Sequence, residues 1–204
     1  MIEFDIDKRT NLEPKVGRLL ISEPFMADVR FFRTVIFIAN HDEDGTLGFV
    51  LNKRPDGNPR VLNAETNEPL FSSHILKKHL SEGGPINEED FFILHDQGQR
   101  LGGHEIIEGI HLGLGDGKMP SNQTLDDFIL DNHKDVQFKF FLGSSGWTVG
   151  QLEAELEIGS WFVAEFNKDI VFSTDYDEMW KQAIYTLGEE FAYFATLPLH
   201  PQLN

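Results

Sequence analysis

Short apolar runs separated by turn residues dominate the first third of the chain, and this pattern predicts strands. Residues 19–22 (LLIS) form one run, and residues 34–41 form a longer one that is rich in β-branched and aromatic side chains. The acidic segment 41–45 (HDEDG) interrupts the pattern, which resumes over residues 46–52. Two apolar runs joined by a polar turn with a glycine are typical of a β-hairpin, which we expect here.

The middle of the chain alternates between strand and helix patterns. A loop is expected over 53–59, followed by a short helix that Ser72-Ser73 caps and the segment GGP (83–85) stops. That helix would carry Ile75, Leu76 and Leu80. Further strands are expected at 90–95, once or twice within 104–114, at 136–142, and in a last hairpin of 161–166 with 170–172; another helix is expected over 124–132.

The last part of the chain carries the clearest helical period. Five apolar residues recur at intervals of four, three, four and three, which places them on one face of a helix. They are Trp180, Ile184, Leu187, Phe191 and Phe194. We expect one long helix that Pro198 ends. Strand pairs interleaved with helices, without a regular βαβ alternation, indicate an α/β (α+β) fold with a mixed sheet.

Composition adds a large apolar core to this picture. The 204 residues include 18 Phe but 3 Tyr and 3 Trp, and a Phe ring has no polar atom to keep at the surface. No cysteine is present, which excludes disulfides, thiolate metal sites and thiol nucleophiles. The N-terminus has no signal-peptide core and no apolar run could span a bilayer, so a soluble cytoplasmic protein is expected.

The formal net charge of −17 argues against direct contact with nucleic acid, because such contact depends on a basic surface that neutralises phosphates. Two short basic patches remain, Lys53-Arg54 with Arg60 and the segment 77–79 (KKH). Pairs of this kind are usually solvated surface. A regulator of transcription with this charge would act through a protein partner.

A glycine-serine segment, 143–146 (GSSG), lies between an expected strand and an expected helix. Its spacing does not match the nucleophile elbow G-x-S-x-G, and neither phosphate-loop pattern is present. It could hold an anion on free backbone N–H groups at a helix start. It could equally be a helix start alone, because Thr148 and Gln151 match a capping box and Gly159 suits a C-cap.

Metal and cofactor sites are not expected from the sequence. The eight histidines show no H-x-H, H-E-x-x-H or H-x₃-H spacing. A hard-ion site can be drawn around His41, Asp42 and Asp44, but an acidic hairpin turn explains these residues more simply. No residue is assigned a catalytic role, so whether the protein is an enzyme stays open.

Four stretches together resemble the AlgH/YqgE family of bacterial proteins. They are residues 19–55, 83–95, 141–161 and 171–188, and the resemblance extends from about residue 18 to residue 190. It implies a mixed sheet curled into a partial barrel with flanking helices, plus a smaller α/β portion. It also implies the family's label, a transcriptional regulator of undefined biochemical activity. We therefore expect a polar leader at 1–17, an AlgH/YqgE-like domain at 18–197 and a tail at 198–204.

Two positions depart from the family pattern. Ala39 stands where many relatives have a cysteine, so no thiol chemistry can occur there. Val29 stands where a proline often follows the early aspartate. Any role that depends on these residues in relatives does not extend to this chain.

Three functions remain open. The first is indirect regulation through a protein partner. The second is binding of a small anion or nucleotide at glycine-rich and polar strand ends, where Lys53 would supply charge and backbone amides would supply hydrogen bonds. Its candidate residues are Asn52, Lys53, Gly83, Gly84, Gly143, Ser144, Ser145, Gly146 and Trp147. The third is a protein-interaction module that docks a partner or a second copy of the chain through exposed aromatic residues.

Overall fold

The structure is a computed structural model that describes residues 12–57, 61, 62, 69, 73–114, 125–132 and 135–198. Its strands are β1 (Leu19–Ser22), β2 (Val35–Asp42), β3 (Gly45–Val50), β4 (Leu80–Glu82), β5 (Ile86–His95), β6 (His104–Ile107), β7 (Ile110–Leu114), β8 (Phe138–Trp147) and β9 (Trp161–Ala164). Its helices are α1 (Ser73–His79), α2 (Gly98–Leu101), α3 (Leu125–Asn132), α4 (Gln151–Glu157), α5 (Lys168–Val171), α6 (Met179–Thr186) and α7 (Ala192–Ala195).

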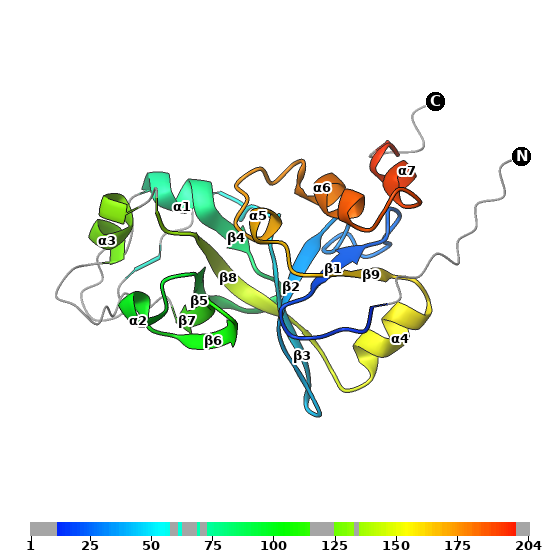
Figure 1. Cartoon of the computed structure of the whole chain (residues 1–204), viewed down its shortest axis with the longest axis horizontal. Helices are drawn as coiled ribbons and strands as arrows, with labels where there is room; N and C mark the ends of the chain where they lie inside the picture. Colours follow the sequence, from blue (N-terminus) through cyan, green and yellow to red (C-terminus); the bar gives the residue numbers. More distant parts are fainter. Residues whose placement is uncertain are drawn as a thin grey trace, which may run out of the picture.

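Within the described residues the strands form one sheet in the order β6-β7-β5-β8-β3-β2-β1-β9, with β4 beside β8. Every pairing is antiparallel except that of β4 with β8, which is parallel. The sheet is therefore mixed, and it curls into a half-barrel with short helices around it (Figure 1). The predicted fold class and the predicted hairpin of β2 with β3 are confirmed.

Strand β8 connects the two halves of the sheet. Its first part pairs with β4 and β5, and its last part pairs with β3. The change occurs between Ser144 and Ser145, just after Gly143, whose φ of 66° lies in the left-handed region that glycine tolerates best. Figure 1 shows β8 running from the side of α1 and α3 toward the side of α4.

The half made of β1, β2, β3 and β9 is buried on both faces, which explains its continuous apolar runs. In β1, Leu19 and Ile21 pack toward the helices α5 to α7, whereas Leu20 packs toward α4 with Trp147 and Trp161. The other half covers its sheet with α1 and α3. There Phe138 and Phe140 of β8 join a separate cluster of buried apolar residues.

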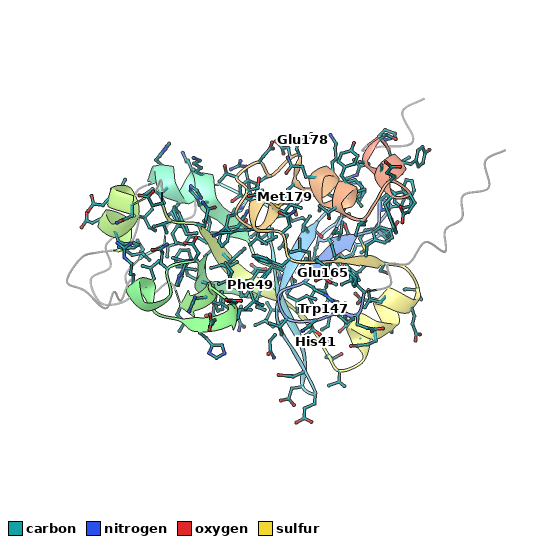
Figure 2. All side chains as sticks on the ribbon, viewed as in Figure 1. His41, Phe49, Trp147, Glu165, Glu178 and Met179 are labelled. Carbon is teal, nitrogen blue, oxygen red and sulfur yellow. The ribbon has the colours of Figure 1, made fainter. Side chains whose placement is uncertain are left out.

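Phenylalanines fill the centre, as the composition predicts. The Phe49 ring lies 4.8 Å from that of Phe141 and 5.0 Å from that of Phe92, measured between centroids. Figure 2 shows Phe49 near the middle of the molecule, where the two halves meet. These rings hold together the strands that β8 links, because each is a large apolar surface removed from water.

The C-terminal third corrects two predictions. Residues 168–171 form the helix α5 where a strand was expected, because the Asn167 side chain accepts a hydrogen bond from the Ile170 N–H and caps a helix start. The long final helix is two short ones, α6 and α7. The chain breaks between them at Gly188, whose φ is 121°. The apolar period survives the break, since Ile184 and Phe191 are both buried in the core.

Two further corrections concern the middle of the chain. Leu80 begins the strand β4 and does not extend α1. The glycine-serine segment lies inside β8, which continues to Trp147, so it is not a turn between a strand and a helix. Residues 1–11 of the expected leader, Ser72, Arg60 and residues 199–204 of the expected tail lie outside the described residues. No helix in the described ranges combines the length and the apolar character needed to span a bilayer.

Candidate functional site

The glycine-rich segments that the sequence predicted as a ligand site do meet in space. The Ser145 hydroxyl donates to the Gly83 carbonyl at 3.1 Å, and the Gly83 N–H donates to the Leu142 carbonyl at 2.7 Å. The Gly83 carbonyl also accepts from the Val50 N–H at 2.9 Å. This crossing of β8 over the end of β4 brings together Gly83, Gly84, Gly143, Ser144 and Ser145.

The crossing is packed tightly. A Cβ atom on Gly83 would lie 2.3 Å from the Gly143 carbonyl oxygen, and one on Gly84 would lie 2.4 Å from that of Ser144. Ser144 and Ser145 are buried, with exposed fractions of 3% and 0%. The glycines are therefore needed for backbone contact between the two halves. The prediction that these five residues hold an anion stays a prediction.

Asn52 and Lys53 anchor a neighbouring loop. The Asn52 amide accepts from the Val35 N–H at 2.8 Å and donates to the Arg33 carbonyl at 2.8 Å. The Lys53 ammonium donates to the Val29 carbonyl at 3.1 Å, and partial burial lowers its pKa. Both side chains thus fasten the segment 23–33, which leads from β1 to β2.

A cleft of about 500 Å³ opens on the other side of that segment. The last two predicted site residues, Gly146 and Trp147, line it together with residues that the sequence did not single out. We call it the aromatic cleft. Its main walls are Phe31, Ile86, Trp147, Gln151, Glu155 and Trp161.

Three aromatic rings of the cleft pack on one another. The Trp147 and Trp161 rings meet edge to face with centroids 5.9 Å apart. The Phe31 ring lies 6.4 Å from Trp147 and 5.7 Å from Trp161. Because the two indoles are almost fully buried and Phe31 is partly exposed, Phe31 forms the side of the cluster that faces solvent.

Glu155 holds both indoles in place. One carboxylate oxygen accepts from Trp147 Nε1 at 2.9 Å and from Trp161 Nε1 at 2.7 Å, and the other accepts from the Gln151 amide at 2.9 Å. An indole N–H can only donate, so a buried one needs an acceptor of this kind. Glu155 thereby fixes the orientation of the rings that line the cleft.

The helix α4 places Glu155, and the sequence predicted its ends in part. The Gln151 side chain accepts from the Thr148 N–H at 3.1 Å, as in a capping box, but the N-cap residue is Gly150 and not Thr148. At the other end Gly159 adopts a φ of 76°. The Ser160 N–H bonds to the Glu155 carbonyl and the Gly159 N–H to that of Leu156, which is a Schellman motif.

A charged pair borders the cleft. Arg30 binds Asp28 through two hydrogen bonds, from Nη2 at 2.6 Å and from Nε at 3.0 Å, and the Arg30 guanidinium lowers the pKa of the Asp28 carboxyl. Arg33, the other arginine of this segment, does not pair with Asp28. The Arg33 guanidinium donates to the Leu197 and Pro198 carbonyls and lies 4.8 Å from the Trp180 ring centroid.

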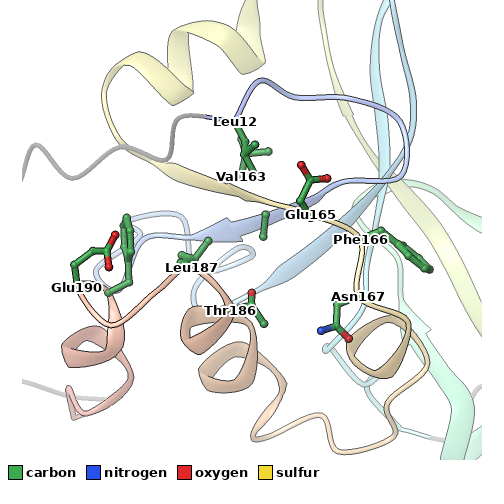
Figure 3. A pocket seen from close by; sticks show the side chains of 10 residues that line it. Leu12, Val163, Glu165, Phe166, Asn167, Thr186, Leu187 and Glu190 are labelled. Carbon is green, nitrogen blue, oxygen red and sulfur yellow. The ribbon is translucent and has the colours of Figure 1, made fainter.

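A second cleft of about 330 Å³ lies between the end of β9 and the helices α6 and α7 (Figure 3). Leu12 and Val163 lie at one side, and Glu165 and Glu190 project from different elements. Glu165 forms an ion pair with Arg18 at 2.7 Å. We call this the helical cleft.

A buried cluster of polar side chains lies in the other half of the molecule. The Lys139 ammonium is 1% exposed, donates to the Ser173 carbonyl at 2.7 Å and lies 4.7 Å from the Tyr176 ring centroid. Arg54 lies 4.1 Å from the same centroid and donates to the Lys77 carbonyl at 2.8 Å. Burial lowers the pKa of Lys139 to about 7.

The described residues contain no group of three or more metal-binding side chains. At the hairpin turn, Asp42 accepts from the Asp44 N–H at 2.9 Å and from the Asn40 amide at 2.7 Å, so these residues close the turn. His41 contacts the Thr46 hydroxyl at 2.7 Å. Ala39 lies at a β-bulge of β2 and is buried in the core, with only a methyl group there.

Sequence reasoning missed the polar centre of the aromatic cleft. Glu155 is one of three closely spaced glutamates, with Glu153 and Glu157, and its local sequence does not distinguish it from them. Phe31 and Trp161 lie far apart along the chain, so no local spacing connects them. The one available signal was that a protein with three tryptophans needs buried acceptors, and Glu155 lies between two of them in sequence.

Comparison with known proteins identifies relatives over nearly the whole chain. A family model described as AlgH-like matches residues 19–192. A UPF0301 protein of Chlorobium phaeobacteroides is 36% identical over 191 residues, covering 92% of this chain and 95% of its own. A UPF0301 protein of Bacteroides thetaiotaomicron is 32% identical over 213 residues, covering 100% of this chain and 99% of its own.

Two solved structures share the fold. The crystal structure of protein DIP2367 from Corynebacterium diphtheriae has a TM-score of 0.65 and 22% identity, covering 93% of this chain and 95% of its own. The solution structure of the AlgH protein from Pseudomonas aeruginosa has a TM-score of 0.56 and 22% identity, covering 93% of this chain and 98% of its own.

Proposed function

The chain belongs to the AlgH-like family, and from that premise we propose that it is a small-molecule-binding protein whose ligand sits in the aromatic cleft. The observation that carries the proposal is the wall of the cleft. There, three packed aromatic rings surround a carboxylate that two indole N–H groups hold in place. An aromatic wall combined with a few fixed polar groups is the usual form of a small-molecule site.

The size and rigidity of the cleft support this function. Its volume of about 500 Å³ lies within the usual range for ligand pockets, roughly 300–1,000 Å³. Glu155, Trp147 and Trp161 are fixed by hydrogen bonds and ring packing, so little side-chain ordering is needed on binding. The predicted residues Gly146 and Trp147 belong to this cleft. The other predicted glycines, Gly83, Gly84 and Gly143, lie at the tightly packed crossing beside the cleft, which leaves no comparable space for a ligand.

The test is a thermal-shift screen of small molecules against the wild type and Ile86→Trp. Ile86 lines the cleft and is 41% exposed, so the larger ring should fill the cleft without disturbing the core. A ligand present at a hundredfold excess over its Kd stabilises the folded state by about 2.7 kcal/mol, which raises Tm by several degrees.

The matched control is Val149→Trp, which adds the same ring at an exposed residue outside the cleft. Compounds that stabilise the wild type and the control but not Ile86→Trp support the proposal. If every stabilising compound acts equally on all three proteins, or if none stabilises the wild type, the aromatic cleft is not a ligand site.

Indirect regulation through a protein partner is a second candidate, and one observation favours it. Large apolar side chains are exposed on the segment that borders the cleft, Phe25 by 56% and Val29 by 81%, and Ile86 lies at the cleft itself. Exposed apolar groups that gather in one area are typical of interaction surfaces. A ligand in the cleft would lie beside such a surface.

Direct contact with nucleic acid is a weaker candidate. The basic side chains of the predicted patch serve the fold, because Lys53 binds the Val29 carbonyl and Arg54 binds the Lys77 carbonyl at the end of α1. The chain as a whole carries a formal charge of −17.

Transcript profiles of host cells test the regulatory candidate. Cells carrying Phe25→Ser with Val29→Asp should differ from the wild type. Cells carrying Tyr185→Ser, which removes an exposed ring on α6, should not. The same profile for both variants would contradict a partner surface beside the cleft.

A further inference from the structure

The charge of the aromatic cleft is not balanced by its own side chains. All the hydrogen-bond donors to the Glu155 carboxylate are neutral, namely two indoles and one amide. Among the described residues no lysine or arginine forms an ion pair with Glu155. A carboxylate that is partly withdrawn from water without a cation attracts one strongly.

Arg30, the one cationic side chain among the described residues that line the cleft, is already neutralised. Arg30 binds Asp28 through both Nε and Nη2, so the pair carries no net charge. The Arg30 guanidinium also lies 5.7 Å from the Phe31 ring centroid. The cleft therefore keeps the single negative charge of Glu155.

One carboxylate of the helical cleft shows the opposite arrangement. Its Glu165 accepts two hydrogen bonds from Arg18, at 2.7 and 3.3 Å, so a charged ligand is not needed to balance it. Glu155 has no such guanidinium partner among the described residues.

The lining also limits the kind of cation. A metal ion needs several oxygen or nitrogen ligands, and no group of three such side chains exists among the described residues. Aromatic rings attract the positive charge of organic ammonium groups and also cover their apolar parts. Phe31 presents a partly exposed ring for this contact, with Trp147 and Trp161 behind it.

We propose that the ligand of the aromatic cleft is a small organic cation, an amine or quaternary ammonium compound whose charge lies near Glu155 and whose apolar part contacts Phe31. The proposal rests on the proposed function and names the ligand class of the same site. It departs from the anion or nucleotide that the glycine-rich sequence suggested, because the one free charge in the cleft is negative.

The experiment compares ammonium compounds with neutral compounds of the same shape. Choline is titrated against 3,3-dimethyl-1-butanol, and 2-phenylethylammonium against 2-phenylethanol, with tryptophan fluorescence as the readout. Trp147 and Trp161 report on the cleft, whereas Trp180 donates to the Ser22 carbonyl elsewhere and provides a constant background. Each titration is repeated with Glu155→Gln and with Glu157→Gln, an exposed glutamate on the same helix.

We expect at least one ammonium compound to bind the wild type about tenfold more tightly than its neutral counterpart. That preference should disappear in Glu155→Gln, whose fold is checked by near-UV circular dichroism, and should persist in Glu157→Gln. Equal affinity for the charged and neutral members, or an unchanged preference in Glu155→Gln, overturns the cation proposal but leaves the cleft as a ligand site. Failure of both ammonium compounds to bind also overturns it, and the Ile86→Trp screen then decides separately whether the cleft binds any ligand.

Discussion

Strand β8 links two halves of the molecule that differ in whether the buried ring nitrogens of their side chains are hydrogen-bonded. At its C-terminal end, Trp147 and Trp161 both donate to Glu155, and on the other face of the same half Trp180 donates to the Ser22 carbonyl at 3.0 Å. At its N-terminal end lie buried nitrogen atoms for which the described residues offer no hydrogen-bond partner. They are His79 Nδ1, His95 Nε2 and His111 Nδ1.

The difference separates buried polar groups that hold the aromatic cleft in a fixed shape from buried polar groups that make the fold less stable in acid. Satisfied indoles hold the aromatic cleft in one shape at little cost, because each buried donor has its acceptor. Burial opposes protonation of the His79 and His95 imidazoles and of the Lys139 ammonium by lowering their pKa values, so the half that contains them is sensitive to pH. The candidate site therefore lies in the half that does not contain these buried imidazoles, and three measurements can break or sharpen this comparison.

Acid should produce the largest effect. Burial lowers the pKa of His79 and of His95 from 6.5 to about 4. Below pH 6.5 the unfolded chain binds protons that the folded chain does not, so stability falls as the pH falls toward 4. We expect a loss of about 2 kcal/mol for each histidine, less than the full shift because the surroundings can relax.

Urea unfolding between pH 7 and about pH 5 measures this loss in the range where most carboxylates stay ionised. His95→Asn should reduce the slope of stability against pH, whereas the exposed His74→Gln should leave it unchanged. A slope that is the same in His95→Asn as in the wild type would contradict the assignment.

Glu155→Leu should have the next largest effect, at the other end of β8. It leaves the indole N–H groups of Trp147 and Trp161 without an acceptor, and these side chains are 6% and 3% exposed. We expect the free energy of unfolding to fall by about 3 kcal/mol, since each unsatisfied buried donor costs roughly 1–3 kcal/mol. Urea midpoints provide the measurement, and Glu157→Leu on the exposed side of α4 is the control. Similar losses in both variants would show that helix propensity, and not the indoles, is responsible.

Lys139→Met should produce the smallest change, and in the stabilising direction. Burial lowers the pKa of Lys139 from 10.5 to about 7. At neutral pH the folded state therefore disfavours protonation of this amine, whereas the unfolded chain binds the proton tightly. Methionine has a similar volume and no charge, although it leaves the Ser173 carbonyl without its donor. We expect a net gain of about 2 kcal/mol at pH 7.

The gain should shrink as the pH rises toward 10.5, because the unfolded lysine then loses its proton as well. Thermal unfolding at pH 7 and at about pH 9.5 provides the measurement. Lys181→Met, at a partly exposed lysine paired with Glu178, is the control and should be close to neutral at both pH values. A destabilised Lys139→Met would show that the ammonium contacts outweigh the cost of burial.

Prediction from the sequence succeeded where the pattern is local. The hairpin of β2 and β3, the strand β1 and the helix α3 follow from apolar periodicity and turn residues over short stretches. It failed where the partner of a segment is distant. Residues 143–146 have the composition of a turn, yet they continue β8 because β5 pairs with Ser144 and β3 pairs with Ser145 and Gly146.

Two incorrect predictions about helices show that a single residue can override the periodic pattern of apolar residues. The spacing of Trp180 to Phe194 is helical throughout, but Gly188 at a φ of 121° divides it into α6 and α7. Asn167 was read as part of a hairpin turn, whereas its side chain caps α5. Both residues are known breakers or caps, and their effect depended on packing that a single-chain pattern does not contain.

The candidate site was predicted to a smaller extent than the fold. Of the nine expected ligand residues, Gly146 and Trp147 line the aromatic cleft, and the tightly packed glycines and serines form the crossing instead. Glu155 and Phe31 were not predicted. They line one cleft because α4 lies close to the segment before β2, and no spacing in the sequence predicts that proximity.

The sequence by itself determined the apolar core, the hairpin, the lack of thiol chemistry and the acidic character, because these follow from residue type and from short-range periodicity. The tertiary structure alone decided that β8 crosses between the two halves, that Glu155 binds two indoles and that its charge remains unbalanced in a cleft. The reason is physical. Strand pairing and side-chain packing join residues that are distant in the chain, and the charge of a site depends on which of them meet.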